Sequence, residues 1–277
     1  MKKTPWHILI TGMLFSLMVL SMAMEAEATE KDLDAKVLNQ NIQIYQEHAN
    51  SGWEEKYLLM ARWTDNDDYV VRTKAEELTR GITDDRSKLE VIYDWVCTSI
   101  YYDDKGASNG AGLSWTDDEW DSYAYYLNSA NGAAGVLRWR RTVCSGYAEL
   151  LAALLRAVGI PCKLVDGYAL GASTSGVWQE ECVTGDFQNH TWNEAFIDGR
   201  WVILDSTWDS GNRVENGVLV ERASTRRYFD ISISDLSKTH NIKRYEIREF
   251  TITYHLNGGS YPFGYHENAD TYYETAS

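Results

Sequence analysis

The sequence predicts a fold that mixes α-helices with an antiparallel pair of β-strands, and three observations lead to this prediction. Apolar residues recur at helical spacing in residues 84–100 and again in 144–158. Residues 162–170 have the composition of a strand. Two further strand-like runs are separated by Asp198-Gly199, a pair typical of a tight hairpin turn. The 277 residues suffice for one good-sized core and a small accessory region.

Residues 1–28 are predicted to be a secretory signal peptide. Lys2 and Lys3 precede an apolar run over residues 8–23, and the small-x-small pattern Ala26-Glu27-Ala28 follows. A membrane anchor is the alternative, but the apolar run is short for a span. We therefore expect a secreted or cell-surface protein whose mature chain has no transmembrane segment.

The net charge of the chain excludes some partners. It is −15, and removal of residues 1–28 leaves it unchanged because two lysines and two glutamates are lost together. A strongly acidic protein repels phosphate groups. Nucleic acid and anionic lipid are therefore not expected to bind, and the oligomeric state stays open.

Two segments before the first strand differ in character. Residues 29–80 are polar with helical periodicity and are predicted to be an N-terminal helical extension. Residues 103–135 are rich in Gly, Asp, Asn and Ser and are interpreted as a long loop, either a functional lid or a disordered insertion. The acidic cluster at 117–121 has no spacing typical of a calcium loop, so neither a metal nor a cofactor is predicted.

The four cysteines allow several assignments. If Cys144 must stay free as a nucleophile, three remain, which is an odd number for disulfide pairing. Cys162 and Cys182 flank one loop and form the pair to test first. Cys97 lies within an apolar helical pattern and is expected to be a small buried hydrophobic residue.

Cys144 stands at the predicted start of the second helix. Unpaired backbone N–H groups and the helix dipole favour negative charge there, and a thiolate is the nucleophilic form of cysteine. The helix runs to Val158, before Gly159 and Pro161 end it. The alternative interpretation is an inert, buried cysteine preceding a core helix.

The hairpin places a candidate base beside a candidate acid. If Asp198-Gly199 forms a two-residue turn, residues whose numbers sum to 397 face each other. His190, Trp192, Asp205 and Thr207 then share one face of the hairpin. His190 and Asp205 would be diagonal neighbours, about 7 Å apart along the backbone and within side-chain reach. A longer loop would move Asp205 to the other face, and His190 as a purely structural residue is the alternative.

These residues predict thiol acyl chemistry. His190 would take the proton of Cys144, Asp205 would hold the imidazole, and the thiolate would attack an acyl carbon to give a thioester. Water as acceptor gives hydrolysis, and an amine gives a new amide. The backbone N–H of Cys144 is a natural donor to the developing oxyanion.

At these residues the chain resembles the transglutaminase-like superfamily, in its bacterial secreted branch. The likeness rests on three segments: KLEVIYDWVCTSIYYD, RRTVCSGYAELLAALLRAVGIPC and HTWNEAFIDGRWVILDSTWD. It implies an α+β, papain-like core over residues 81–247, in which the nucleophile helix packs on an antiparallel sheet. It also implies that Cys144 is the nucleophile, His190 the base and Asp205 the acid. Many relatives have proline after the acid, where this chain has Ser206.

Residues 248–277 resemble part of one Listeria-Bacteroides surface repeat, with strand-like runs on either side of Asn-Gly-Gly. A plain C-terminal hairpin is the alternative.

We therefore expect a secreted thiol acyltransferase or hydrolase that acts on peptide or protein amides, with cell-wall peptides among the candidate substrates. Two alternatives stay open. The same triad would serve a cysteine peptidase or peptidoglycan amidase, or the fold is a surface binding or scaffolding module without catalysis.

Overall fold

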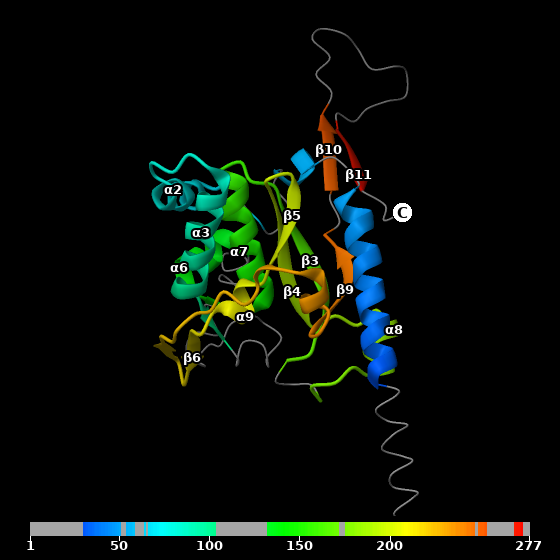
Figure 1. The fold of residues 1–277 in the computed structure, drawn as a ribbon. Helices are drawn as coiled ribbons and strands as arrows, with labels where there is room; N and C mark the ends of the chain where they lie inside the picture. Colours follow the sequence, from blue (N-terminus) through cyan, green and yellow to red (C-terminus); the bar gives the residue numbers. More distant parts are fainter. Residues whose placement is uncertain are drawn as a thin grey trace, which may run out of the picture. The chain divides into compact units, whose positions relative to one another are not determined.

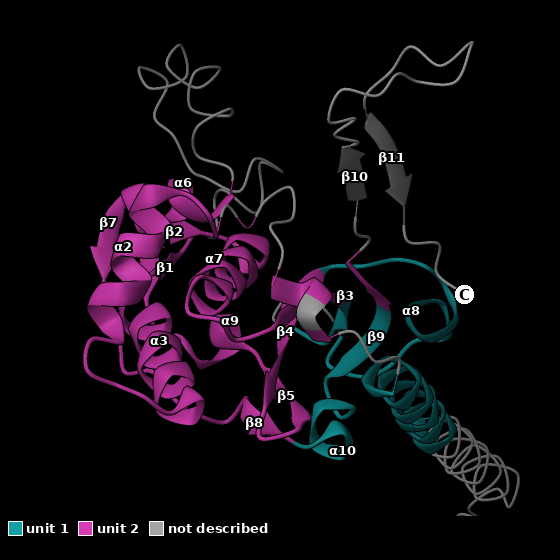
Figure 2. Cartoon of the chain, turned by 90° about the horizontal axis from the view of Figure 1, so that it is seen from above, with its two compact units in different colours: residues 1–50, 167–189, 232–243 teal, residues 51–166, 190–231, 244–277 magenta. Residues whose placement is uncertain are grey.

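The computed structural model describes residues 30–50, 54–58, 64, 66–103, 132–171, 175–246, 249–253 and 269–273 (Figure 1). The predicted signal peptide and the acidic cluster at 117–121 lie outside the described residues. None of the helices within them is long and apolar enough to cross a membrane. The chain divides into two compact units (Figure 2). The predicted hairpin with His190 and Asp205 lies in the larger unit.

The fold is α+β, as predicted. The first helix covers residues 30–49. The helices after it are η1 (Glu54–Leu58), α2 (Tyr69–Leu78), α3 (Asp85–Ser99), α6 (Gly132–Trp139), α7 (Cys144–Ala157), α8 (Glu180–Thr184), α9 (Ser206–Asp209) and α10 (Ile233–Leu236).

The described strands form three sheets. The central one has five strands in the order β8 (Phe229–Ile231), β5 (Arg200–Leu204), β4 (His190–Ile197), β3 (Cys162–Ala169) and β9 (His240–Tyr245). The second has the order β2 (Arg141–Thr142), β1 (Tyr101–Tyr102), β6 (Arg213–Glu215) and β7 (Val218–Val220). In the tail, β10 (Glu249–Thr253) pairs antiparallel with β11 (Ala269–Tyr273), and the Asn-Gly-Gly segment between them lies outside the described residues.

Both long core helices have the ends that the sequence predicts. The Asp84 side chain accepts a hydrogen bond from the backbone N–H of Ser87 and so caps the start of α3. Past the end of α7, Gly159 has φ of +85°, the left-handed conformation that glycine adopts without strain. These helices pack on one another, and α7 also contacts β4 of the central sheet (Figure 1).

The β4–β5 hairpin has the predicted register. Asn193 pairs with Leu204, and Ile197 pairs with Arg200, across Asp198 and Gly199. Both turn residues have positive φ, 52° and 77° respectively, as a type I′ turn requires. The predicted continuation of β5 to Thr207 is wrong, because the chain leaves the sheet after Leu204 and enters helix α9.

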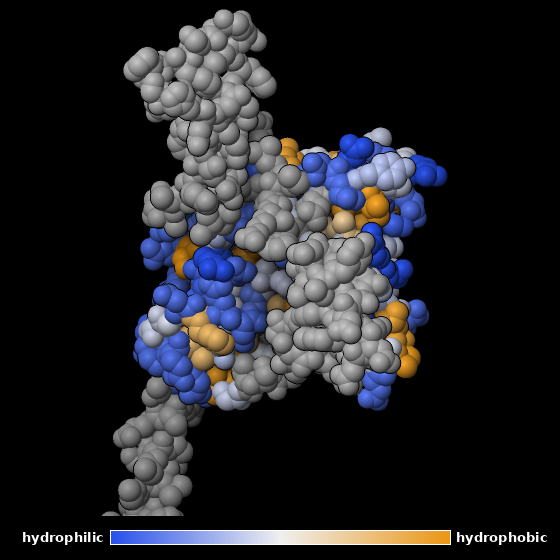
Figure 3. Space-filling model, turned by 180° about the vertical axis from the view of Figure 1, so that it is seen from behind, coloured by the Kyte–Doolittle hydropathy of each residue, from blue (hydrophilic) through white to orange (hydrophobic). Residues whose placement is uncertain are grey.

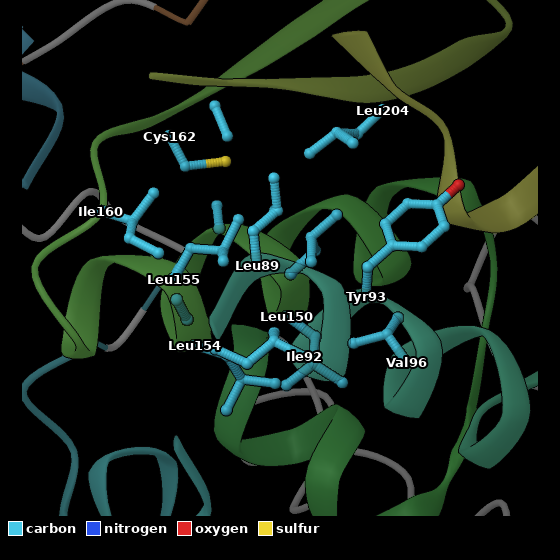
Figure 4. Close-up of a cluster of buried hydrophobic side chains, with 14 of the residues drawn as sticks. Leu89, Ile92, Tyr93, Val96, Leu150, Leu154, Leu155, Ile160, Cys162 and Leu204 are labelled. Carbon is cyan, nitrogen blue, oxygen red and sulfur yellow. The ribbon is translucent and has the colours of Figure 1, made fainter. Parts of the chain in front are cut away.

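The hydrophobic core of the larger unit lies between α3, α7 and the hairpin (Figure 4). Its largest fully buried side chains include Leu89, Ile92, Tyr93, Leu150, Leu151, Leu154 and Leu155. Cys97 is buried in this cluster, as predicted. Burial raises the pKa of the Cys97 thiol well above its usual range, so Cys97 stays protonated.

Cys162 and Cys182, the pair to test first, do not form a disulfide. Each of them packs into a different hydrophobic cluster. Cys162 is fully buried in the core of the larger unit. Cys182 packs against the smaller cluster, whose buried members are Leu33, Val37, Tyr168, Trp178 and Val183.

The segment 103–135, interpreted as a loop, includes the start of a helix. Helix α6 begins at Gly132, inside the predicted loop 103–135, because its small and apolar residues pack against α7. The rest of that loop, residues 104–131, lies outside the described residues. Helix α8 lies in the segment between β3 and β4.

The smaller unit is held together by a buried asparagine on the helix of residues 30–49. Asn41 Nδ2 donates to Ser237 Oγ and to the His240 carbonyl, at 2.9 and 2.7 Å. Its Oδ1 accepts from the backbone N–H of Ile242 at 2.7 Å. These bonds fasten the predicted N-terminal extension to the α10–β9 segment of the same unit.

A buried ion pair joins β3 to β4 in the larger unit. Lys163 is fully buried, with Nζ 3.7 Å from Glu194 Oε2 and 3.6 Å from the ring centroid of Trp201. Tyr245 donates its hydroxyl to Glu194 Oε1 at 2.7 Å. Burial lowers the pKa of Lys163 to about 8, although Glu194 acts in the opposite direction.

The visible surface is mostly hydrophilic, with small apolar patches (Figure 3). The large apolar side chains exposed among the described residues are Tyr69, Val70, Val177, Phe187, Val218 and Leu219.

Candidate active site

Cys144 is the first residue of α7 and is half-buried. The residue before it, Val143, has an extended backbone and offers no side chain to cap the helix. The first N–H groups of α7 therefore lack a capping side chain, and a negative charge on the Cys144 sulfur is favoured there.

Gly146 lets the start of α7 lie close to β2. A Cβ atom at this position would come within 2.0 Å of Thr142 Oγ1. Thr142 itself is fixed by strand pairing, since its carbonyl accepts from Asp103 N at 2.9 Å. The absence of a side chain at Gly146 thus permits the close approach of α7 and β2.

His190 is the first residue of β4, and its side chain is buried. Its Nε2 lies 2.7 Å from Asp205 Oδ2. The Cys144 thiol also hydrogen-bonds to the His190 ring. Since Nε2 bonds the acid, Nδ1 is the nitrogen that faces the thiol.

Asp205 divides its two carboxylate oxygens between two tasks. Oδ1 accepts from the backbone N–H groups of Thr207 and Trp208, at 2.9 and 3.1 Å, and so caps α9. Oδ2 bonds His190. The capping bonds fix the carboxylate, so its second oxygen reaches the imidazole in one orientation.

The charge state of His190 follows from opposing effects. Burial lowers the pKa of His190, whereas the charge of Asp205, its hydrogen bond and the Cys144 thiol raise it, to a net value of about 10 against the ordinary 6.5. The imidazole is therefore protonated at neutral pH, with one N–H toward Asp205 and the other toward the Cys144 sulfur.

The raised pKa of His190 predicts a pH dependence of stability. The stabilisation is complete below about pH 6.5 and is lost as pH rises through about 10, because only the folded state holds this proton strongly. The free energy of unfolding of wild type should therefore exceed that of H190Q by an amount that shrinks over this range. Denaturant titrations of both proteins measure it, and a constant difference would contradict the prediction.

Two tryptophans surround the imidazole. The ring centroids of Trp192 and Trp208 lie 6.0 and 5.7 Å from that of His190. Trp192 is buried, whereas Trp208 is half-buried and packs edge-on against Tyr228. The hairpin register predicts Trp192 on this face, but the position of Trp208 follows from α9 and was not predicted.

His190 and Asp205 are the residue types that bind metals, but they are bonded to each other. The thiol chemistry predicted from the sequence needs neither a metal nor a cofactor.

A cysteine at a helix start, hydrogen-bonded to a histidine that is bonded in turn to an aspartate, is the arrangement of papain-like thiol proteins. Residues 72–206 match the family model of the transglutaminase-like superfamily. Over these residues, just under half of the chain, the protein is therefore similar to that superfamily.

The chain is similar to two mammalian proteins named kyphoscoliosis peptidase. It is 31% identical to the mouse protein over 135 residues, which cover 49% of this chain and 17% of that protein. It is 32% identical to the human protein over 127 residues, covering 46% and 16% respectively. The chain thus matches less than a fifth of either relative.

Among solved structures, the chain is similar to a candidate cysteine protease from Cytophaga hutchinsonii. The sequence identity is 21% and the TM-score is 0.39, covering 79% of this chain and 62% of that chain.

Proposed function

We propose that this protein is a thiol acyltransferase or hydrolase that acts on peptide or protein amide bonds through a thioester on Cys144. The observation that carries the proposal is the hydrogen-bonded series from Cys144 through His190 to Asp205. A scaffold has no need of a base and an acid at these distances, whereas nucleophilic catalysis by a thiol needs both.

In the proposed reaction the thiol proton of Cys144 has moved to His190, so the pair starts as a thiolate and an imidazolium. The thiolate attacks the carbonyl carbon of the amide, and the carbonyl π electrons move to oxygen. When the C–N bond breaks, the departing amine takes a proton from the His190 imidazolium, leaving a thioester and neutral imidazole. The imidazole then removes a proton from water or from an amine, which attacks the thioester. Expulsion of the thiolate restores the starting state.

The backbone N–H of Cys144 is the proposed donor to the oxyanion, since it lies at the uncapped start of α7. The half-buried Trp208 beside His190 would bound the space occupied by the substrate.

Alkylation by iodoacetamide tests the site without any assumption about the substrate. Mass spectrometry of the separate peptides compares Cys144 with Cys182, which is also half-buried and free and so serves as a matched control in the same chain. At pH 6–7 we expect Cys144 to react at least about tenfold faster than Cys182, because the imidazolium stabilises its thiolate. H190A should remove the difference.

Equal rates for the two cysteines, unaffected by H190A, would contradict the catalytic proposal and favour a binding or scaffolding module.

A cysteine peptidase or peptidoglycan amidase is the second candidate function, and the name of the mammalian relatives favours it. The two candidates differ in the acceptor, which is water for a peptidase. Incubation with a glutamine-containing peptide, with and without a labelled primary amine, distinguishes them. Product carrying the label would reject a pure peptidase, and label-free cleavage would reject an obligate transferase.

We further propose that residues 1–28 direct export and that 248–277 form part of a surface repeat. The charge pattern and small-x-small site at the N-terminus support export. The pairing of β10 with β11 supports a hairpin in the tail, which a surface repeat shares with other hairpins. Recovery of a chain starting at Thr29 outside the producing cells is the expected result, and a chain retained inside with residues 1–28 attached would contradict export.

A further inference from the structure

Asp209 is a buried carboxylate that the proposed reaction does not use. It ends α9, and only 1% of its surface is exposed. Its side chain accepts four hydrogen bonds. Oδ1 accepts from Thr225 Oγ1 at 2.6 Å and from Arg227 N at 2.9 Å, and Oδ2 accepts from Tyr93 Oη at 2.6 Å and from Tyr228 N at 3.0 Å.

Three of these donors belong to residues 225–228, a segment that we call the strap. A fifth bond joins the same partners through the backbone, since Thr225 N donates to the Asp209 carbonyl at 2.8 Å. Asp209 therefore holds the strap against the end of α9.

The strap in turn holds the candidate acid. The Tyr228 carbonyl accepts from Asp205 N at 3.1 Å, and Asp209 N donates to the Asp205 carbonyl at 3.2 Å. The ring of Tyr228 packs at 5.2 Å against Trp208, which lies beside His190. Hydrogen bonds thus connect Asp209 to the strap, the strap to Asp205, and Asp205 back to Asp209.

We propose that Asp209 is a positioning residue that, through the strap, fixes Asp205 in the orientation needed to hold His190. The inference rests on the proposed function, which assigns to Asp205 the task of holding His190. A carboxylate is required at this point, since all four of its partners are donors and two of them are backbone N–H groups that cannot reverse. A neutral amide would oppose one of those N–H groups with its own NH₂.

The test compares D209N with Y93F in the full-length protein, using Cys144 alkylation across pH. Asparagine has nearly the shape of aspartate but loses acceptors for the strap, whereas Y93F removes one bond to Asp209 and leaves both strap N–H bonds in place. We expect D209N to slow alkylation at pH 7 by about tenfold or more and to move its pH dependence toward that of Cys182. Y93F should stay within about twofold of wild type.

Thermal unfolding of both variants separates positioning from general destabilisation. An alkylation profile of Cys144 that is unchanged in D209N would overturn the proposal. So would an equal change of that profile in D209N and Y93F, if both variants are destabilised to the same extent. If D209N does not fold, hydrogen exchange in wild type decides. Free exchange at the Arg227 and Tyr228 amides while the Asp205 amide stays protected would show that the strap does not hold the acid.

Alkylation also separates this inference from the proposed function. A wild-type protein that cleaves and transfers no amide, but whose alkylation profile changes in D209N, would contradict the function and keep the positioning role. If the wild-type protein cleaves or transfers an amide and the alkylation profile of D209N is unchanged, the proposed function is kept and the positioning role of Asp209 is contradicted.

Discussion

Replacing Asp205 with asparagine should slow the proposed thioester formation by about ten-thousandfold, a loss typical of a histidine held in the wrong tautomer. The reason is that the two carboxylate oxygens of Asp205 have different hydrogen-bond partners. Oδ1 accepts from two backbone N–H groups and Oδ2 faces His190. The single oxygen of asparagine satisfies only one of these tasks.

If that oxygen stays with the backbone, the side-chain NH₂ faces Nε2 of His190 and forces the imidazole proton onto Nδ1, toward the thiol. The ring then cannot accept the proton of Cys144. Single-turnover rates with an amide substrate, or Cys144 alkylation rates, measure the effect. D198N is the matched control, because this turn residue has φ of 52°, which asparagine tolerates well. A D205N enzyme as active as D198N would contradict the prediction.

Gly146→Ala should destabilise the protein by about 1–3 kcal/mol and slow alkylation of Cys144. Alanine usually stabilises a helix relative to glycine, by about 1 kcal/mol. Here the added Cβ would lie 2.0, 2.8 and 2.9 Å from Thr142 Oγ1, Cβ and Cγ2. The clash outweighs the helix preference, so the start of α7 must move away from β2 and carry Cys144 with it.

A second substitution isolates the cause, because the three nearest atoms all belong to one side chain. In a protein that already carries T142G, adding G146A should raise the free energy of unfolding rather than lower it. Denaturant titrations of the four proteins in this cycle measure the change of sign. Stabilisation by G146A in both backgrounds would show that the close approach is not what selects glycine.

Short-range patterns account for what the sequence predicts well. The hairpin register follows from the two turn residues alone. The contact between His190 and Asp205 could therefore be predicted from the sequence. The end of α7 follows from a local signal, because Gly159 lies just beyond the last turn. Each of these features depends on residues close together in the chain.

Features that depend on distant residues were missed or wrong. Helix α6 contains Gly132 and Gly135, which lower helix propensity, and its packing against α7 compensates. The role proposed for Asp209 involves Tyr93 and the strap, which are far from it in sequence. Cys162 and Cys182 pack into two separate hydrophobic clusters, which no cysteine spacing reveals.

The start of α9 explains why Ser206 can replace the proline of many relatives. Ser206 is the first residue of the helix, and the cap bonds go to the N–H groups of the next two residues. Proline suits a first helical position because its missing N–H is not needed there. Asp205 is extended, with φ of −125° and ψ of 91°, as a residue before proline usually is. The departure from the family pattern therefore leaves the acid in place.

The capping bonds of Asp205 also give the site a built-in spectroscopic reporter. The amide protons of Thr207 and Trp208 donate to the same carboxylate that holds His190. Any event that changes the charge of the imidazole, such as thioester formation, alters the electron density on that carboxylate and hence the chemical shifts of both protons. Two backbone amides would thus follow the proposed reaction without a probe attached to the substrate.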